Sequence, residues 1–452
     1  MLKFAVAALA AATLLPSAHA QDAALTARMD EVARSYMRNN GYMGSVLVVR
    51  GDEVLIDKSY GSANLDWNIP NAPDVKFRLG SLTKQFTAAL ILLMQQDGKL
   101  NIADPVSKYL PDAPATWSKI TVNELLNHTS GIPNFTSDPT FPVWSASPRT
   151  PAEELAYFSA KPLDFEPGSK YSYSNSNFEV LGIILEKVSR KSYNDLLQER
   201  LFVPLGMHDS GLDADNLILP KRALGYSNDN GKLVYARSES LTVPWAAGSL
   251  YSTTHDLLLW EHGLFGGKVL SPASLTAMTT PGKGHYALGI EAITLDGLKV
   301  VQHDGGIEGF TTHMAYVPEK RIAVIVLSNV ATVAPPEMGA QLLDLALGKS
   351  VEIKAERKAV PIAPAELTKF AGVYDLTPSL ALTFSVKEGV LYASVGPQTF
   401  SLMYQGVRNG HQYFFLSAAN IDIEFIPDST GAITSMLWMQ KGAETQTGKR
   451  RP

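Results

Sequence analysis

Gly80-Ser81-Leu82-Thr83-Lys84 opens a strongly apolar segment that predicts a helix running to about residue 96. A spacing of three residues places Lys84 on the same helix face as Ser81. A serine hydroxyl is a weak nucleophile until a base takes its proton, and a lysine kept neutral by burial or a neighbouring cation can be that base. The free N–H groups at a helix N-terminus also favour developing negative charge. The stretch therefore predicts a nucleophilic serine, and the alternative is an N-cap serine beside a solvated lysine.

The sequence Tyr-Ser-Asn occurs twice, at residues 173–175 and 226–228. The first copy leads straight into a predicted helix over residues 177–188. Side chains two residues apart on an extended segment point the same way, so Tyr173 and Asn175 share one side. The phenol can relay a proton if nearby cations lower its pKa, and the amide can bind a substrate carbonyl and Lys84. The second copy stands in a polar stretch that is typical of a turn.

A third motif, His303-Asp304-Gly305-Gly306, follows a predicted strand from Leu298 to Val301. Its glycines allow a backbone to approach a ligand closely. The alternative is a turn at the end of a strand with a surface histidine.

Taken together and in this order, the three motifs resemble the signature of the serine β-lactamase and penicillin-binding-protein superfamily, Ser-x-x-Lys, then Ser- or Tyr-x-Asn, then Lys- or His-x-Gly. The resemblance is strongest to the branch of class C β-lactamases, D-Ala-D-Ala carboxypeptidases, D-aminopeptidases and related esterases. It covers roughly residues 24–347, including the stretches 125–133, 247–253 and 306–310.

The resemblance implies a catalytic role for four residues. Ser81 is the acylated nucleophile, and Lys84 with Tyr173 forms the proton-transfer system, in which either could be the resting base. His303 tunes the protonation of these two groups. No metal or cofactor is implied, since the chain lacks His-Glu-x-x-His, a glycine-rich phosphate loop and any cysteine.

The resemblance also implies a substrate-binding set. Asn175 positions the substrate, and the backbone N–H groups of Ser81 and Gly306 form the oxyanion hole. Gly305 and Asp304 complete the third motif. Threonine is usual where Asp304 stands, and an ionised carboxylate only accepts hydrogen bonds, so we expect Asp304 to disfavour penicillins and D-Ala-D-Ala ends. The alternative is that Asp304 points away from the cleft, because strand side chains alternate.

Hydrophobic periodicity outlines an α+β domain over residues 21–348. A helix at 24–39 and a hairpin around Gly51-Asp52 precede a mostly helical middle, and strands over 298–328 and a helix at 336–347 follow it. Two helix starts in the middle are predicted as capping boxes, Thr121 with Glu124 and Thr150 with Glu153. This order of elements predicts one α+β domain in which an antiparallel sheet joins the two ends of the segment and a helical insertion lies between its strands. The resemblance implies that this domain, with helices flanking the sheet, is β-lactamase/transpeptidase-like.

The last part of the chain differs in character. Residues 349–364 are charged and proline-containing and predict a linker. Regularly spaced short strands over residues 365–452, one of them expected over residues 399–405, predict a small barrel or sandwich. They resemble the small lipocalin-like β-barrels appended to some D-aminopeptidase-type members of the superfamily.

The N-terminus predicts export. Lys3, an apolar run and Ala18-His19-Ala20 form a signal peptide over residues 1–20 with cleavage after Ala20, so we expect a periplasmic or secreted protein without stable membrane insertion. A net charge of −5 without a basic stripe disfavours nucleic-acid binding.

The sequence thus predicts an exported serine hydrolase that cleaves a small ester or amide, with D-amino-acid peptides among its candidate substrates. Its partner is a small-molecule or short-peptide substrate, and the oligomeric state is left open. A β-lactamase or D-Ala-D-Ala carboxypeptidase is the alternative enzyme, and a catalytically idle sensor or binding module is the alternative of another class.

Overall fold

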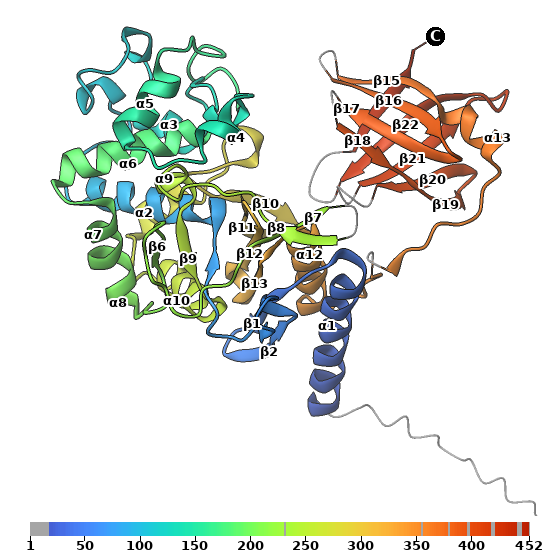
Figure 1. The fold of residues 1–452 in the computed structure, drawn as a ribbon, viewed down its shortest axis with the longest axis horizontal. Coiled ribbons are helices and arrows are strands. Elements are labelled where there is room, and N and C mark those ends of the chain that lie inside the picture. The colour runs from blue at the N-terminus through green and yellow to red at the C-terminus, as the bar shows by residue number, and fades with distance from the viewer. Residues whose placement is uncertain are drawn as a thin grey trace, which may run out of the picture.

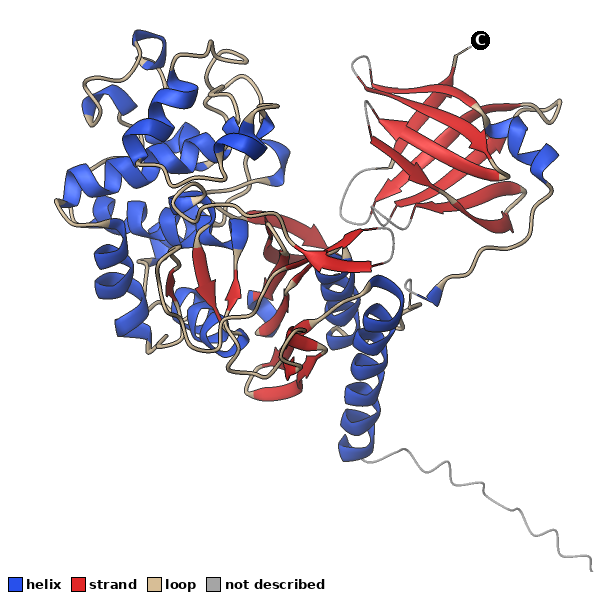
Figure 2. Ribbon diagram, viewed as in Figure 1, coloured by secondary structure: helices blue, strands red, loops and turns tan. Residues whose placement is uncertain are grey.

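The computed structural model describes residues 18–451, apart from 230–231, 354–355, 378–379, 396–397, 417–420 and 441–444. Residues 1–17, most of the predicted signal peptide, lie outside the described residues. Along the part of the chain that is described, no helix is both long and apolar enough to cross a membrane. Figures 1 and 2 show a mixed body of helices and strands and, at the C-terminus, a separate group of strands.

The centre of the mixed body is a six-stranded antiparallel sheet in which β1 pairs with both β2 and β13. The two ends of the predicted domain therefore meet in one sheet, as expected. Along the sheet the strands are β10 (Glu291–Leu295), β11 (Leu298–Ile307), β12 (Phe310–Val317), β13 (Ile322–Ser328), β1 (Gly44–Arg50) and β2 (Glu53–Tyr60).

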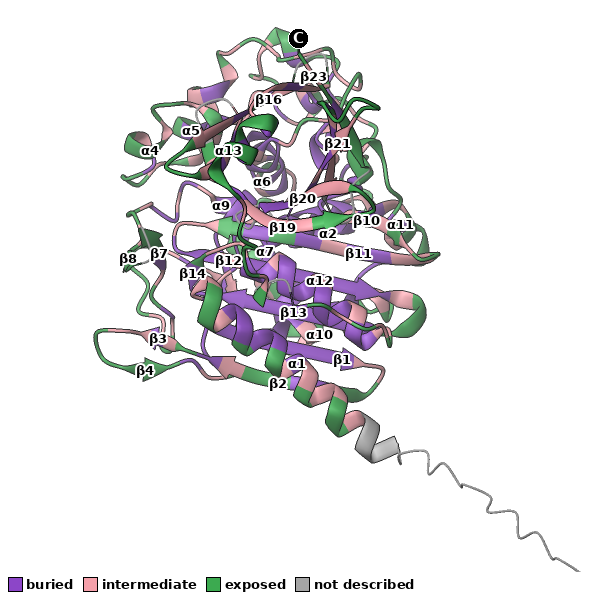
Figure 3. Ribbon diagram, turned by 90° about the vertical axis from the view of Figure 1, so that its right-hand side faces the viewer, coloured by how far each residue is buried: buried purple, intermediate pink, exposed green. Residues whose placement is uncertain are grey.

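Helices cover both faces of this sheet, so the middle strands are apolar throughout rather than alternating. Every residue of β13 is buried, whereas β2 at the edge has exposed residues (Figure 3). Val46 and Val324 pack toward α1 (Ala18–Asn40) and α12 (Ala334–Ala346), and Leu47 and Ile325 join the larger core on the opposite face. The two faces thus have separate cores, and the larger one includes α2 (Thr83–Gln96) and α10 (Thr254–Phe265).

The helical insertion follows the predicted pattern. Both predicted capping boxes are present: Thr121 and Glu124 cap α3 (Val122–Leu126), and Thr150 and Glu153 cap α5 (Pro151–Ser159). Other helices of this region are α4 (Phe141–Trp144), α6 (Asn175–Ser189), α7 (Tyr193–Leu197), α8 (Val203–Leu205), α9 (Trp245–Gly248) and α11 (Pro272–Met278). Short strands lie between them: β3 (Ser62–Asn64), β4 (Ile69–Pro70), β5 (Phe77–Arg78), β6 (Gly211–Leu212), β7 (Tyr226–Asp229), β8 (Lys232–Tyr235), β9 (Leu250–Ser252) and β14 (Val330–Ala331).

After residue 348 the chain builds a nearly closed nine-stranded antiparallel sheet around an aromatic core that includes Phe370, Tyr374, Phe414 and Phe425. A short helix, α13 (Pro364–Leu367), precedes it. The strands are β15 (Gly372–Thr377), β16 (Leu380–Lys387), β17 (Val390–Val395), β18 (Gln398–Ser401), β19 (Met403–Arg408), β20 (His411–Leu416), β21 (Ile421–Pro427), β22 (Ile433–Gln440) and β23 (Gln446–Arg450).

Three details differ from the sequence-based expectation. The single strand expected over residues 399–405 is two strands, β18 and β19, which form opposite ends of the nine-stranded sheet. The second Tyr-Ser-Asn lies in the paired strand β7 rather than in a turn. The third motif does not follow its strand but lies within β11, which continues to Ile307.

Candidate active site

Lys84 is buried in direct contact with Ser81. Ser81 lies in a 3-10 turn (Gly80–Leu82) that leads into α2, and Lys84 is in the first turn of that helix. The Lys84 Nζ donates to Ser81 Oγ at 2.9 Å, to Asn175 Oδ1 at 2.8 Å and to the Ala247 carbonyl at 2.8 Å. Burial lowers the pKa of Lys84 to about 7, although the nearby Glu179 opposes this shift. The expected common helix face is confirmed, and a large part of the lysine is neutral at neutral pH.

Asn175 is fixed by hydrogen bonds on both sides. As the first residue of α6, it accepts from Lys84 through Oδ1 while its Nδ2 donates to Thr136 Oγ1 at 3.1 Å. Its backbone N–H donates to Asn134 Oδ1 at 3.0 Å. These contacts define which side of the amide faces the lysine.

Tyr173 lies beside Ser81 and Lys84. The Lys84 Nζ is 4.9 Å from the centroid of its ring. Burial raises the pKa of Tyr173 well above its ordinary value, and the neighbouring Ser81 hydroxyl only partly opposes this. Its hydroxyl has no well-aligned hydrogen bond to any described residue. Tyr173 is therefore a protonated phenol, and the condition named for it in the sequence analysis, a pKa lowered by nearby cations, is not met.

His303 is neutral and bonded to a tyrosine that sequence analysis missed. Its Nδ1 lies 2.5 Å from the Asp304 carbonyl, which only accepts, so Nδ1 carries the hydrogen. Nε2 then accepts from the Tyr286 hydroxyl at 2.9 Å. Burial, together with the charge of Lys84, lowers the pKa of His303 to about 4. The ring of His303 lies 6.4 Å from that of Tyr173, so any influence on the proton-transfer pair is indirect.

Two glycines, Gly80 and Gly305, allow the turn that carries Ser81 to lie directly against β11. A β-carbon on Gly305 would lie 2.0 Å from the carbonyl oxygen of Leu79. Gly80 has φ +56°, and a β-carbon there would lie 2.7 Å from the Gly306 nitrogen. Gly305 therefore permits close packing and has no room to contact a substrate, whereas Gly306 and Ser81 line the same cavity.

Asp304 lies on the other face of the sheet from Ser81. It pairs across the sheet with His313, whose Nδ1 is 2.6 Å from its Oδ1. The ring of His313 packs against Gly339 of α12. Because neighbouring side chains of a strand point to opposite faces, His303 faces the helical core and Asp304 faces α12. The substrate contact expected for Asp304 is thus wrong, and so is the charge argument built on it.

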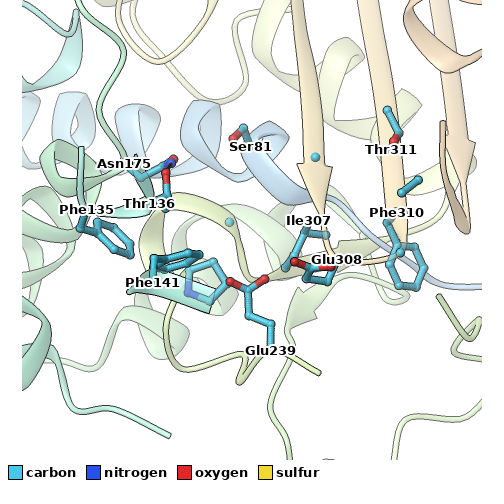
Figure 4. Close-up of a pocket in the computed structure, with 16 residues that line it drawn as sticks. Ser81, Phe135, Thr136, Phe141, Asn175, Glu239, Ile307, Glu308, Phe310 and Thr311 are labelled. Carbon is cyan, nitrogen blue, oxygen red and sulfur yellow. Dashed lines mark hydrogen bonds between the residues drawn. The ribbon is translucent and has the colours of Figure 1, made fainter. Parts of the chain in front are cut away.

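A cavity of about 400 Å³ opens at Ser81 (Figure 4). Aromatic rings, including Phe135, Phe141 and Phe310, form much of its wall. Its charged lining residues are acidic, Glu239 and Glu308. Figure 4 shows their carboxylates across the cavity from Ser81.

The two carboxylates are in different environments. Burial and the neighbouring Glu308 raise the pKa of Glu239 to about 7. Glu308 accepts from the Arg237 guanidinium at 2.7 and 3.0 Å. Within the described residues no cluster of three or more His, Cys, Asp or Glu is placed to hold a metal ion.

Sequence analysis missed several contributors to this site: Glu239 and Thr136 in the cavity wall, and, around Lys84, Tyr173 and His303, the residues His128, Glu179 and Tyr286 and the carbonyl of Ala247. The His128 ring packs 4.3 Å from that of Tyr173, and burial keeps this histidine neutral by lowering its pKa. His128 and Ala247 lie within the stretches 125–133 and 247–253 that carried the resemblance, which was the only signal for them. The sequence held no signal that could have identified Tyr286 or Glu179 as part of the site.

Comparison with known proteins identifies the family of this chain. Penicillin-binding protein 4* of Bacillus subtilis is 26% identical over 90% of this chain and 94% of its own. D-amino acid amidase from Ochrobactrum anthropi SV3 is 25% identical, with a TM-score of 0.64 over 72% of this chain and 99% of that one. The octameric penicillin-binding protein homologue from Pyrococcus abyssi shares the fold, with 24% identity and a TM-score of 0.68 over 94% of this chain and 99% of that one. The Beta-lactamase family model matches residues 29–348, and the chain therefore belongs to the Beta-lactamase family.

Proposed function

We propose that this serine hydrolase cleaves small amides or esters that carry a free amine, through an acyl-enzyme on Ser81. The observation that carries the proposal is the contact between Ser81 Oγ and a buried lysine whose pKa is about 7. A lysine with its ordinary pKa would be almost entirely protonated at neutral pH and could not take the serine proton. Since Tyr173 holds its own proton, we assign the resting base to Lys84.

Acylation then proceeds in two steps. Ser81 Oγ bonds to the substrate carbonyl carbon while its proton passes to the neutral Lys84 amine. The carbonyl oxygen becomes an oxyanion, which the backbone N–H groups of Ser81 and Gly306 stabilise. The bond to the leaving amine or alcohol breaks, and that group takes the proton back from Lys84 through the Tyr173 hydroxyl. Water repeats the sequence in place of the serine and releases the acid.

The charge of the cavity supports an amine-bearing substrate. Glu239, whose pKa is about 7, is ionised in part at neutral pH and then attracts an ammonium group and repels a carboxylate, whereas Arg237 offsets much of the charge of Glu308. A penicillin or a D-Ala-D-Ala end carries a carboxylate, and no lysine or arginine is among the described residues that line this cavity. The likeness to a D-amino acid amidase supports the same substrate class. The sequence analysis assigned discrimination against substrate carboxylates to Asp304, and we now assign it to Glu239 and Glu308.

Labelling with a fluorophosphonate probe tests the nucleophile. The wild-type protein should gain one adduct on Ser81 by mass spectrometry, and Ser81→Ala should gain none. An unlabelled wild-type protein would favour the idle sensor or binding module.

Hydrolysis of D-alanine p-nitroanilide, compared with its N-acetylated form, tests the substrate class. The free amine should be favoured about tenfold or more, and Glu239→Gln should reduce the preference. Equal rates for the two compounds, together with rapid hydrolysis of a penicillin, would restore the β-lactamase alternative.

We also propose that the chain is exported by residues 1–20 and that residues 349–364 link two independently folded domains. The apolar N-terminal run followed by Ala18-His19-Ala20 supports the first, and the separate core after residue 364 supports the second. Cell fractionation and N-terminal sequencing of the mature protein test export.

A further inference from the structure

A second cavity, of about 530 Å³, adjoins the one that opens at Ser81. Glu239 and Glu308 line both cavities, so these two side chains form the boundary that the cavities share. Figure 4 shows both of them across the first cavity from Ser81. Arg237 and Ala146 line the second cavity and are not among the described residues that line the first. A substrate bound at Ser81 therefore meets this boundary at the far end of its cavity.

The Arg237 guanidinium joins the segments that form the boundary. Its Nε and Nη2 donate to Glu308 Oε1 at 3.0 and 2.7 Å, and its Nη1 donates to the Pro142 carbonyl at 2.6 Å and to Ser145 Oγ at 3.2 Å. A backbone hydrogen bond of 2.9 Å, from the Ser240 N–H to the Ser145 carbonyl, connects two of the same segments. Because a guanidinium presents its donors in a rigid fork, these contacts fix the spacing of the segments.

The turn that carries Glu308 has little room to move. The next residue, Gly309, has φ +78°, and a β-carbon there would lie 2.6 Å from Gly225 Cα and 2.7 Å from Ala236 Cβ. The side chains of the Arg237–Glu308 pair are 35% and 30% exposed, and the Coulomb attraction of such a pair contributes little by itself. The closure of the boundary therefore depends on this packing and on the several hydrogen bonds that Arg237 makes.

We propose that Arg237 is a specificity-determining residue: it closes the Ser81 cavity at the boundary and so limits the amine side of the substrate to a single amino-acid residue. This inference rests on the proposed function, in which Glu239 attracts the free amine of the substrate. An amine held at a closed boundary leaves no space for a further residue beyond it. Without the guanidinium, the Ser81 cavity opens into the second cavity, which can hold such a residue.

The products formed from D-alanyl-D-alanine p-nitroanilide test this role, because one molecule offers two amide bonds to the same enzyme. The wild-type protein should cleave first between the two alanines, so that D-alanine exceeds the intact dipeptide by about tenfold or more among the initial products. Arg237→Ala should admit both residues and release the dipeptide with p-nitroaniline, which changes the ratio by about tenfold or more. Mass spectrometry of the initial products measures the ratio. Any change in the charge of the wall acts on the same substrate amine in both reactions.

Arg149→Ala is the matched control. The Arg149 Nε and Nη2 donate to the Trp144 carbonyl at 3.3 and 3.1 Å, so this change loosens α4, the short helix that Arg237 also holds. Arg149 is not among the described residues that line either cavity, and the product ratio should stay at the wild-type value.

A double variant tests whether the second cavity receives the added residue. Ala146→Trp places a large ring in the wall of that cavity, and in the Arg237→Ala background it should restore the wild-type ratio. If Arg237→Ala does not fold, Glu308→Ala carries the test, because it opens the same boundary from its other side.

Four results would overturn the inference: release of the dipeptide by the wild-type protein as fast as release of D-alanine; a wild-type ratio in folded Arg237→Ala; an equal change in Arg149→Ala; or a gain of dipeptide in Arg237→Ala that persists when Ala146→Trp is added. A wild-type protein that cleaves neither bond and gains no fluorophosphonate adduct would instead refute the proposed function.

Discussion

Substitution of Gly305 by alanine should impair both stability and activity, whereas the same change at the adjacent Gly306 should leave stability unchanged. A β-carbon on Gly305 would lie 2.0 Å from the Leu79 carbonyl oxygen and 2.2 Å from Thr312 Oγ1. Contacts between carbon and oxygen are normally above about 3 Å, so the backbone has to separate by about 1 Å. The Leu79 oxygen belongs to the main chain and already accepts from Thr312 Oγ1 at 2.8 Å, so no side-chain rotation relieves the clash. A β-carbon on Gly306 would meet no atom within 4 Å.

The displacement in Gly305→Ala would move the turn that carries Ser81 away from β11. Misplacement of reacting groups by about 1 Å can cost about 10²-fold in rate, and overpacking of a close-packed site costs about 1–3 kcal/mol of stability. We therefore expect a loss of about 10²-fold in kcat for p-nitrophenyl acetate together with a lower Tm. In Gly306→Ala the Tm should be unchanged, and any effect should be on KM.

Steady-state kinetics and thermal melting of the two variants measure these effects. Wild-type kcat and Tm in Gly305→Ala would refute the argument that the close approach of the two segments aligns the site. Equal destabilisation in Gly306→Ala would show that steric clash is not the cause.

Three further outcomes are expected. Lys84 has to be neutral to act as the base, and its pKa is about 7, so kcat/KM for a non-ionising ester should fall about tenfold per pH unit below pH 6 and level off above pH 8. A profile that is flat from pH 5 to 9 would exclude Lys84 as the base. Tyr173→Phe should lose about 10²–10⁴-fold in turnover, whereas Tyr226→Phe, which loses only a hydrogen bond from the Leu65 N–H, should not, and equal losses would reject the assignment. A chain that ends after residue 348 should fold by circular dichroism, since the nine-stranded sheet has its own core; a wholly unfolded product would place the boundary elsewhere.

Local geometry made the centre of the site predictable. The contact between Ser81 and Lys84 follows from helical spacing, and the two capping boxes follow from Thr and Glu three residues apart. The direction of Asp304 was also within reach. If the His303 side chain faces the helical core, the Asp304 side chain has to point to the other face of the sheet, because neighbouring side chains of a strand alternate.

Other parts of the site depend on tertiary contacts that no local pattern encodes. Tyr286 bonds to His303 from an irregular segment, which has no periodicity that would predict the contact. Glu179 is one of several buried residues of α6, and a glutamate at such a position does not by itself indicate a neighbouring active site. Strand β23 consists of Gln446–Arg450, which has no apolar residue, and it is a strand because β15 and β22 pair with it.

The pairing of β1 with β13 also determines the order in which the molecule can form. The Tyr42 hydroxyl bonds to the Leu327 carbonyl, 285 residues further along the chain. Such a high contact order makes folding slow, because a very long loop has to close before any contact rewards it. Strand β1 can pair with β2 soon after both are made, but its other edge stays unpaired until β13 is made, when nearly three quarters of the chain has been synthesised. The nine-stranded sheet, by contrast, pairs mostly neighbouring strands. During that interval the apolar β1 and α2 are exposed to chaperones, proteases and aggregation.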